Sequence, residues 1–452
     1  MAKERLMVIG GDAAGMSAAT AARRQNRDLT ILALERGPYT SYSACGIPYY
    51  VGGLVDSPES LIVRTPRQFQ EKHAIDVRVG HEVTAIDSQG RRVLVVNRAT
   101  QKTGWWEPYD QLLIATGALA FCPDLPGADA QGIYGVTTLQ SGIRVRQAVD
   151  KDRPARAVVV GGGYIGLEMA EALIRRGIEV ALVQKGVQVM GTLDPDMGAL
   201  VSDALREVGV ALYLEEALEG FEVEQGRVTA IVTDQRTLPA DMVILGLGVR
   251  PNSALAREAG IPLGIKEAIK VNSRLQTAVD GIWAAGDCVE SLHLVSLRPH
   301  YIALGTVANK QGLVAGINLG GGYATFPGVV GTAVSKICKY EVARTGLQEK
   351  EIQALGLQYV TATIQSKTRA GYYPGAGIIT VKILAEQGSG RLLGGQIVGV
   401  EGAAKRIDVL AVALHAGLTV QQLIHLDLSY APPYSPVWDP VQIAARQVIK
   451  KV

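Results

Sequence analysis

Short apolar runs followed by glycine-rich turns recur along this chain. The run 6–9 (Leu-Met-Val-Ile) leads into the turn 10–15, an alanine-rich stretch over 16–25 and a second apolar run over 29–34. The same order returns in the run 157–160, the turn 161–166, a helical stretch to about Arg176 and a run over 179–183. Short apolar runs that alternate with helices predict parallel strands buried on both faces. We therefore expect two units of strand, turn, helix and strand.

Three further segments, 109–117, 241–248 and 281–287, have the pattern of a buried strand that ends in a polar turn. From about residue 325 the pattern changes, with strand-like runs over 377–384 and 392–400 and a helix over 404–415. These elements predict an α/β fold with two Rossmann-like domains and a C-terminal α+β domain. The first domain is expected to be discontinuous, over 1–120 and 250–324, with the second over 121–249 and the third over 325–452.

Composition and charge narrow the class of protein. The 452 residues are 48% apolar and 19% charged, which is ordinary for a water-soluble globular chain, and the net charge of +2 gives no argument for nucleic acid. The chain has no apolar run long enough to predict a membrane span, and a strand-like run begins too early to leave room for a secretory signal. The four cysteines are scattered without metal-ligand spacing, so we predict a cytoplasmic protein with no metal site.

The first glycine-rich turn has the features of a dinucleotide-binding signature. Gly10 and Gly15 take the first and last places of GxGxxG, while Asp12 stands in the middle place. Glu35 follows Gly15 by twenty residues, where an acid can accept hydrogen bonds from ribose hydroxyls. Such a turn lets a pyrophosphate approach the backbone at a helix N-terminus. An ordinary strand-to-helix turn is the alternative for this unit taken alone.

The second turn carries all three glycines, Gly161, Gly163 and Gly166. Gln184 and Lys185 stand at the tip of the following strand. Gln184 carries no charge that would repel a 2′-phosphate and Lys185 is able to attract one, but Gln184 can also bind an unphosphorylated ribose. The pattern therefore leaves NADH and NADPH open.

Cys45 lies between the two turns, in the segment 41–48 (Ser-Tyr-Ser-Ala-Cys-Gly-Ile-Pro). Proline is tolerated in the first turn of a helix, so we expect Cys45 at a helix N-terminus, where unpaired N–H groups stabilise a thiolate. A buried structural cysteine is the general alternative. The polar context and the neighbouring nucleotide turn favour a reactive thiol.

These segments together resemble the FAD- and NAD(P)H-binding elements of the pyridine nucleotide-disulfide oxidoreductases. The resemblance rests on the two glycine turns, Glu35, the run 115–117 (Ala-Thr-Gly) and the run 285–287 (Ala-Gly-Asp), and it extends over essentially the whole chain. Most flavin disulfide reductases have a second cysteine five positions after the first, where this chain has Tyr50. The chain thus resembles the single-cysteine branch, which includes coenzyme A-disulfide reductases, NADH oxidases, NADH peroxidases and persulfide reductases.

The resemblance implies roles for the three domains and for individual residues. It implies that the first domain binds FAD, the second binds NAD(P)H and the third forms a dimer interface. The implied FAD contacts are Gly10, Ala14, Gly15, Glu35, Arg36, Ser43, Val83, Ala115, Thr116, Gly117, Gly286 and Asp287. The implied NAD(P)H contacts are Gly161, Gly163, Tyr164, Ile165, Gly166, Glu168, Gln184, Lys185 and Gly248.

Two features favour one member of the branch. Peroxide- and oxygen-reducing members carry a histidine in the first turn, where this chain has Ala13. The segments 370–375 and 429–435 resemble the tyrosine segments of coenzyme A-disulfide reductases, and by position Tyr372 and Tyr430 would reach Cys45 of a partner subunit. Packing at an interface is the alternative for both tyrosines.

The resemblance also implies contacts to coenzyme A from Ser17, Arg24, Ser41 and Lys72, although Arg24 and Lys72 would equally suit a solvated helix face. We therefore expect a homodimeric FAD-dependent NAD(P)H:disulfide oxidoreductase that reduces coenzyme A disulfide. Its catalytic residues would be Cys45, Tyr430 and Tyr372, and coenzyme A would form a mixed disulfide with Cys45. An NADH oxidase, a persulfide or polysulfide reductase, and a flavin-bound redox sensor with little turnover are the alternatives.

Overall fold

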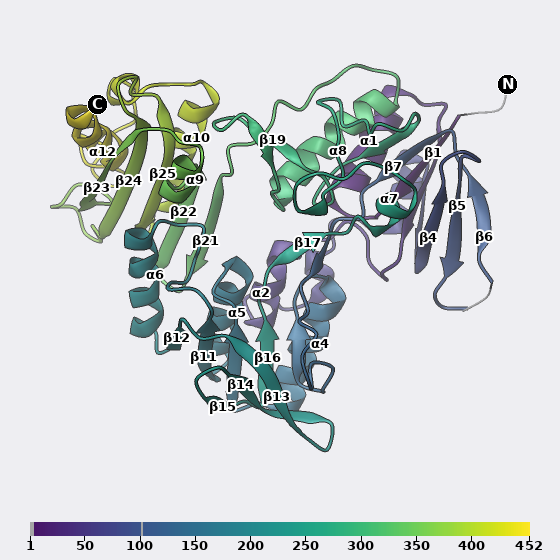
Figure 1. Cartoon of the computed structure of the whole chain (residues 1–452), viewed down its shortest axis with the longest axis horizontal. Helices are drawn as coiled ribbons and strands as arrows, with labels where there is room; N and C mark the ends of the chain where they lie inside the picture. Colours follow the sequence, from purple (N-terminus) through teal and green to yellow (C-terminus); the bar gives the residue numbers. More distant parts are fainter. Residues whose placement is uncertain (1–3, 101–102) are drawn as a thin grey trace.

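The computed structural model describes residues 4–100 and 103–452 (Figure 1). Residues 1–3, which bear on the predicted lack of a secretory signal, lie outside the described part. Three sheets with their covering helices make up most of the molecule. In the described ranges, no helix has the length and apolar character needed to cross a membrane.

The first sheet is parallel and has five strands in the order β18–β7–β1–β2–β3. Side chains of β1 alternate between two buried layers: Leu6 and Val8 face helices α1 and α8, whereas Met7 and Ile9 face the strands β4 and β5. This double burial is the reason why the strand is apolar throughout. The bounds are β1 (Arg5–Ile9), β2 (Thr30–Glu35), β3 (Ile75–Val79), β7 (Gln111–Ile114), β18 (Ile282–Ala284), α1 (Ala13–Gln25), α3 (Pro66–His73), α7 (Ala254–Glu258) and α8 (Gly305–Leu319), with β4 (His81–Asp87), β5 (Arg92–Asn97) and β6 (Trp105–Pro108) in a separate antiparallel sheet.

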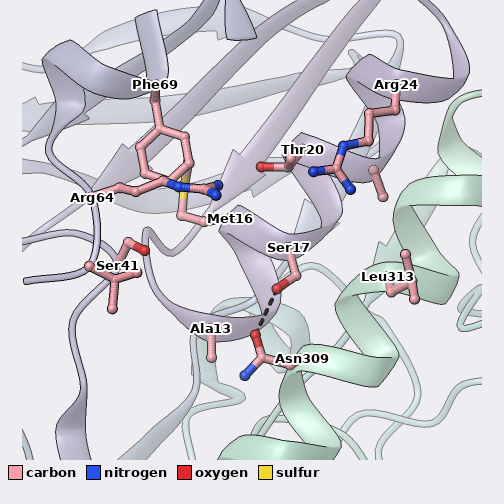
Figure 2. A pocket seen from close by; sticks show the side chains of 12 residues that line it. Ala13, Met16, Ser17, Thr20, Arg24, Ser41, Arg64, Phe69, Asn309 and Leu313 are labelled. Atoms are coloured by element: carbon pink, nitrogen blue, oxygen red, sulfur yellow. Dashed lines mark hydrogen bonds between the residues drawn. The ribbon is translucent and has the colours of Figure 1, made fainter. Parts of the chain in front are cut away.

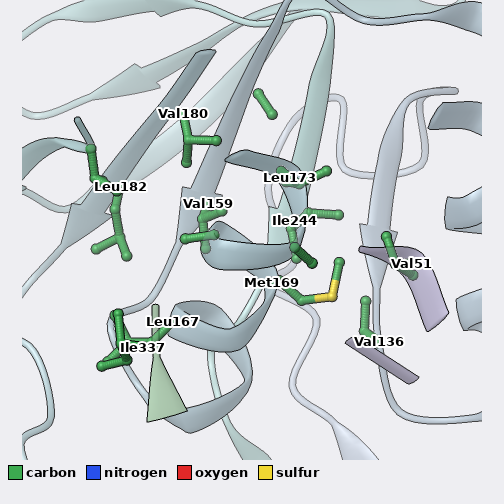
Figure 3. Packing of buried hydrophobic residues seen from close by; sticks show 14 of the residues in the cluster. Val51, Val136, Val159, Leu167, Met169, Leu173, Val180, Leu182, Ile244 and Ile337 are labelled. Carbon is green, nitrogen blue, oxygen red and sulfur yellow. The ribbon is translucent and has the colours of Figure 1, made fainter. Parts of the chain in front are cut away.

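The second sheet repeats this plan in the order β12–β11–β10–β16–β9, with α5 in the place of α1. Figure 3 shows Val159 and Leu182 of this sheet packed near Leu167 and Leu173 of α5. The bounds are β9 (Ile133–Gly135), β10 (Arg156–Val160), β11 (Glu179–Gln184), β12 (Ala211–Leu214), β16 (Met242–Leu245), α4 (Leu139–Asp152), α5 (Tyr164–Arg175) and α6 (Pro195–Glu207). A small antiparallel sheet of β13 (Leu218–Glu224), β14 (Arg227–Thr233) and β15 (Thr237–Pro239) covers the other face.

The chain crosses between these two units twice, at β8 (Ala118–Ala120) and β17 (Val249–Pro251), which pair antiparallel. The crossings lie beside the predicted limits at residues 120 and 250. The short pair β19 (Ser291–His293) and β20 (Arg298–His300) then leads to α8. Single helical turns stand at η1 (Ala44–Gly46), η2 (Pro58–Leu61) and η3 (Ile265–Glu267).

The C-terminal unit is an antiparallel sheet in the order β21–β22–β25–β24–β23 with helices around it. The predicted fold class of two Rossmann-like units and an α+β unit is confirmed. The bounds are β21 (Ala333–Ile337), β22 (Tyr340–Gly346), β23 (Tyr359–Lys367), β24 (Ile378–Glu386), β25 (Leu392–Gly399), α9 (Glu349–Ala354), η4 (Ala404–Arg406), α10 (Ile407–His415), α11 (Val420–Ile424), α12 (Pro440–Val448) and η5 (Ile449–Lys451).

One buried lysine joins the second unit to the C-terminal sheet. Lys382 of β24 has a side chain that is 4% exposed, and its Nζ lies 2.7 Å from Asp196 Oδ1, 2.7 Å from Glu349 Oε1 and 3.2 Å from Asp194 Oδ2. The lysine thus meets carboxylates from both units. Removing a single partner from such a cluster would leave a buried charge uncompensated.

Helices α1 and α8 lie so close that their backbones touch. An added Cβ on Gly312 would lie 2.3 Å from the carbonyl oxygen of Ala14, and one on Gly316 would lie 2.3 Å from the carbonyl oxygen of Ala18. Glycine on α8 opposite alanine on α1 is therefore a steric requirement of this contact. The contact holds α1, and with it the first glycine-rich turn, against the rest of the first unit.

We expect Gly316→Val to lower the free energy of unfolding by about 3 kcal/mol, because the added side chain meets backbone rather than a movable side chain. Urea unfolding of the purified protein measures the change. Gly305→Ala is the matched control on the same helix, since a Cβ there meets no atom within 4 Å. Equal midpoints for the two variants would contradict the steric argument.

Candidate active site

The first glycine-rich turn is closed by backbone contacts that only glycine permits. Gly10 has a φ of +111°, and a Cβ there would lie 2.1 Å from the carbonyl oxygen of Ala115. A Cβ on Gly15 would lie 2.0 Å from the carbonyl oxygen of Gly10. The turn therefore lies directly beside the 115–117 segment, and the start of α1 reaches the carboxyl end of β1. This is the place where open α/β sheets bind nucleotides.

Glu35 at the tip of β2 holds this turn. Its Oε2 accepts a hydrogen bond of 2.8 Å from the N–H of Gly11, and its Oε1 accepts one of 2.7 Å from the N–H of Gly37. A carboxylate has about four acceptor sites, so capacity is left for ribose hydroxyls. The neighbouring Arg36 is exposed.

Asp12 explains the departure from the glycine signature. Its Oδ1 accepts a hydrogen bond of 3.1 Å from the N–H of Tyr42, and the N–H of Ser41 donates to the carbonyl of Gly11 at 2.9 Å. The residue in the middle of the turn thus anchors the segment that carries Cys45. Burial raises the pKa of Asp12 to about 7, and the charges of Glu35 and Asp287 act in the same direction.

Most of the remaining predicted FAD contacts lie near the same turn. Val83 of β4 is the exception, because it is buried in the apolar layer under the sheet. Gly286 and Asp287 follow β18, and a Cβ on Gly286 would lie 2.8 Å from the Cβ of Ala14. Ser43 is exposed beside Cys45, and Thr116 donates to the carbonyl of Asn252 at 2.6 Å.

Two buried polar atoms in this region have no hydrogen-bond partner among the described residues: Oδ1 of Asp287 and the hydroxyl of Tyr301. Burial raises the pKa of Asp287 to about 6. Buried polar groups are nearly always paired, so these two atoms are free to bind the polar groups of a ligand. The orphaned atoms and the glycine-lined turn fit a dinucleotide such as FAD.

The second turn has the same geometry. Gly161 has a φ of +104°, and a Cβ on Gly166 would lie 1.9 Å from the carbonyl oxygen of Gly161. Gln184 accepts a hydrogen bond of 2.8 Å from the N–H of Gly162, which is the contact that Glu35 makes in the first unit. The neutral amide of Gln184 therefore holds the second turn by the same hydrogen bond that the carboxylate of Glu35 forms in the first turn, but without a negative charge. The geometry fits a nicotinamide dinucleotide in this turn.

The other predicted NAD(P)H residues surround this turn. Tyr164 and Ile165 begin α5 and are half-buried, whereas Gly163, Lys185 and Gly248 are exposed. Glu168 lies one turn further along α5 and is half-buried. All of these positions stand at the carboxyl end of the second sheet or at the start of the helix that covers it.

Cys45 lies in η1, directly before α2 (Ile47–Val51), and Pro48 stands in the first turn of α2 as predicted. The predicted lowering of its pKa is wrong for the protein chain itself. Although Cys45 retains solvent access, partial desolvation raises the pKa of its thiol, and the charges of Glu168, Asp287 and Asp12 raise it further. The physical reason is that desolvation, followed by the charges of the surrounding carboxylates, outweighs the small dipole of α2, which has only five residues.

A cavity of about 390 Å³ opens between α1, α8 and the segment after Cys45 (Figure 2). Ser17, Arg24 and Ser41, three of the four residues predicted to contact coenzyme A, line it. Ser17 donates a hydrogen bond of 2.8 Å to Oδ1 of Asn309 on α8. Lys72, the fourth predicted residue, is exposed and does not line the cavity.

The lining residues that were not predicted include Arg64, Phe69 and Asn309. The guanidinium of Arg64 lies 5.8 Å from the ring centre of Phe69. Arg64 reaches the cavity because Val63, its neighbour, donates from its N–H to the carbonyl of Ser41 at 2.8 Å. No local motif marks this pairing, so the sequence offered no signal for it.

Positive charge gathers at the cavity. The pKa of His73 is lowered, first by partial burial and then by the charges of Arg64, Arg24 and Lys72. Lys72 therefore contributes to the same electrostatic field although it lies outside the cavity wall. A cavity with such surroundings suits an anionic ligand.

The two predicted tyrosines meet on the C-terminal unit, far from Cys45 along the chain. Tyr372 is 79% exposed and Tyr430 is 47% exposed. A hydrogen bond between their hydroxyls raises the pKa of Tyr430. The two segments are joined by the N–H of Ala370, which donates to the carbonyl of Pro432 at 3.1 Å. The hydroxyls of Tyr372 and Tyr430 therefore lie side by side on the exposed surface of the C-terminal unit.

Residues 4–312 match the pyridine nucleotide-disulphide oxidoreductase family, and residues 332–440 match the dimerisation domain of the same family. The chain belongs to the pyridine nucleotide-disulphide oxidoreductases. As a member of this family it is an NAD(P)H-dependent flavoprotein disulfide oxidoreductase.

Three similar proteins have different activities in their names. The chain is 35% identical to an NADH oxidase of Methanocaldococcus jannaschii over 99% of both chains. It is 32% identical to a coenzyme A disulfide reductase of Staphylococcus haemolyticus, over 95% of this chain and 96% of the other. The solved structure of a NAD-dependent persulfide reductase from A. fulgidus superposes with a TM-score of 0.96 at 39% identity, over 99% of this chain and 83% of the other.

Proposed function

We propose that this protein is an FAD-dependent NAD(P)H:disulfide oxidoreductase that reduces coenzyme A disulfide through a mixed disulfide on Cys45. The observation that carries the proposal is one cysteine placed between two dinucleotide turns and near a cavity with a positive surround. Tyr50 is buried in the place of a second cysteine, so an internal disulfide cannot form there. We therefore infer that the resolving thiol is external, and we propose coenzyme A in this role.

In the proposed reaction, the Cys45 thiolate attacks one sulfur of coenzyme A disulfide. A Cys45–sulfur bond forms, the substrate S–S bond breaks, and the leaving coenzyme A sulfur takes a proton and departs as a thiol. When bound at the first turn, FAD would supply the two-electron reduction, drawn from NADH or NADPH, by which the mixed disulfide reopens and the second coenzyme A leaves. The chain itself positions Cys45, through Asp12 and Ser41, beside the first turn.

The cavity is proposed to hold part of coenzyme A, with Arg24 and Arg64 facing its phosphates. Arg64 is half-buried, and its stacking on Phe69 limits its freedom. A guanidinium held in place in this way loses less side-chain entropy when it binds a phosphate than a mobile one does. Ser17 and Ser41 supply polar contacts on opposite walls (Figure 2).

The proposal includes a homodimer in the cytoplasm. Tyr372 and Tyr430 are proposed to reach Cys45 of the partner subunit, where Tyr430 donates a proton to the leaving sulfur. Their exposure and their shared hydrogen bond support a role at an interface. The proposed domains are FAD-binding over 1–120 and 250–324, NAD(P)H-binding over 121–249 and dimerising over 325–452. Gln184 supports the use of either nicotinamide, since it presents no carboxylate to a 2′-phosphate.

A persulfide reductase is the second candidate, because the similar structure from A. fulgidus carries that activity in its name. Oxygen reduction is a third reaction of similar proteins. Turnover on coenzyme A disulfide, polysulfide and oxygen, each with NADH and with NADPH, separates these candidates. Negligible turnover on all three would support a redox sensor instead.

We expect Cys45→Ser to lower kcat/KM for coenzyme A disulfide at least about 10³-fold, because the attacking sulfur is lost. Flavin reduction by NADH in stopped-flow measurements should stay nearly normal. Cys122→Ser is the control, since Cys122 is exposed and lines neither described pocket. Full reductase activity in Cys45→Ser would disprove the mechanism.

Arg64→Met should raise KM for coenzyme A disulfide roughly 10-fold, because a charged hydrogen bond is worth about 1.5–3 kcal/mol. The KM for polysulfide, which has no phosphate, should change little. Arg67→Met is the matched control, since Arg67 pairs with Glu71 on the exposed face of α3. An equal rise in KM for both substrates would argue against phosphate binding at Arg64.

Tyr430→Phe should lower kcat for coenzyme A disulfide by roughly 10²-fold, the lower end for loss of a general acid, while flavin reduction by NADH is kept. Steady-state and stopped-flow rates measure the two effects. Tyr434→Phe provides the comparison, because Tyr434 is exposed in the same segment but is not one of the two predicted catalytic tyrosines. Slower flavin reduction in Tyr430→Phe would point to a structural role.

A further inference from the structure

Two glutamates of α5 stand beside the segment that carries Cys45. Glu168 and Glu171 are one helical turn apart, so they share a face. They line a small pocket together with Pro48 and Tyr49 of α2. A pair of carboxylates therefore faces the element that follows the reactive thiol.

The C-terminal sheet holds both carboxylates. Oγ of Ser335 on β21 donates a hydrogen bond of 3.1 Å to Oε1 of Glu168. Beyond the end of the same strand, the N–H of Cys338 donates one of 2.8 Å to Oε2 of Glu171. Ile337 lies within the core of the second unit (Figure 3), so β21 is packed firmly against α5. Ser335 itself is buried.

Glu168 has a pKa close to neutral pH, so both of its protonation states are populated there. Burial raises its pKa to about 7; the hydrogen bond from Ser335 opposes this rise and the charge of Glu171 adds to it. After desolvation, the charge of Glu168 is the largest influence that raises the pKa of Cys45. The pKa of Tyr49 is raised as well, by burial and then by Glu168, Glu171 and Cys45. The titratable groups around Glu168 are Tyr164, Glu171 and Arg175 on α5, Cys45 and Tyr49 in the η1–α2 segment, and Cys338 after β21.

We propose that Ser335 is a positioning residue that, through its hydrogen bond to Glu168, sets the reactivity of Cys45. The proposal rests on the proposed function, since it concerns the thiol that attacks the disulfide. It adds a role to Glu168 beyond the predicted contact with NAD(P)H. In this proposal, the packing of the C-terminal sheet on α5 also influences the reactivity of Cys45 in the same chain.

The direction of the effect follows from the two charges. The hydroxyl of Ser335 favours ionised Glu168, and ionised Glu168 disfavours the Cys45 thiolate. Removing the hydroxyl keeps Glu168 protonated to higher pH, which leaves more thiolate on Cys45. The effect is largest just above the pKa of Glu168 and disappears at alkaline pH, where Glu168 is ionised in both proteins.

The experiment measures the rate of alkylation of Cys45 by iodoacetamide against pH. It uses the flavin-loaded protein after dithiothreitol treatment and desalting. Glu168→Gln should react at least about threefold faster at pH 7.5, which corresponds to half a pKa unit. Ser335→Ala should react faster than wild type between about pH 7 and 8 and should match it above about pH 9.

The double variant decides whether Ser335 acts through Glu168. Ser335→Ala in the Glu168→Gln background should change nothing further, and Ser335→Thr should restore the wild-type profile because it keeps a hydroxyl. Ser366→Ala on β23 is the control from the same sheet and should be neutral. An unchanged profile in Ser335→Ala, or an equal change with Gln at position 168, would overturn the proposal. Because alkylation needs no coenzyme A disulfide, these results are independent of whether that substrate is turned over.

Discussion

The close contact between α1 and α8 is the constraint on which the site depends. Backbone meets backbone there because Gly312 and Gly316 have no side chains, and alanines on α1 leave the space open. The contact fixes α1, whose first turn carries the dinucleotide signature. It also places Ser17 beside Asn309, which closes one wall of the cavity. The first glycine-rich turn and the cavity thus both depend on this helix pair.

The residues that depart from the usual nucleotide signatures have structural reasons. Asp12, in the middle of the first turn, binds the N–H of Tyr42 and so holds the Cys45 segment. Gln184 replaces the acid of the second turn but keeps its hydrogen bond to the glycine loop. In both cases one side chain holds the backbone by a hydrogen bond. The carboxyl group of Asp12 and the neutral amide of Gln184 still differ in what they present to a ligand.

The electrostatics around Cys45 belong to all three units. Asp12 and Asp287 come from the first, Glu168 from the second, and the serine that holds Glu168 from the C-terminal sheet. Together these carboxylates oppose the thiolate, so its formation depends on what neutralises or displaces their charge. The buried contacts of Lys382 keep the second unit and the C-terminal sheet in the register that this arrangement needs.

Periodicity and glycine spacing were enough to predict the two Rossmann-like units, the C-terminal unit and the place of Cys45 before a helix, because these features depend on contacts between neighbours in the chain. Three of the cavity residues, Ser17, Arg24 and Ser41, were named only because the chain resembles its family. The raised pKa of Cys45, the place of Arg64 at the cavity, the hydrogen bond from Ser335 to Glu168 and the position of Lys72 outside the cavity wall emerge only in the tertiary structure. Burial and charge at a site sum over elements hundreds of residues apart, and no local pattern records that sum.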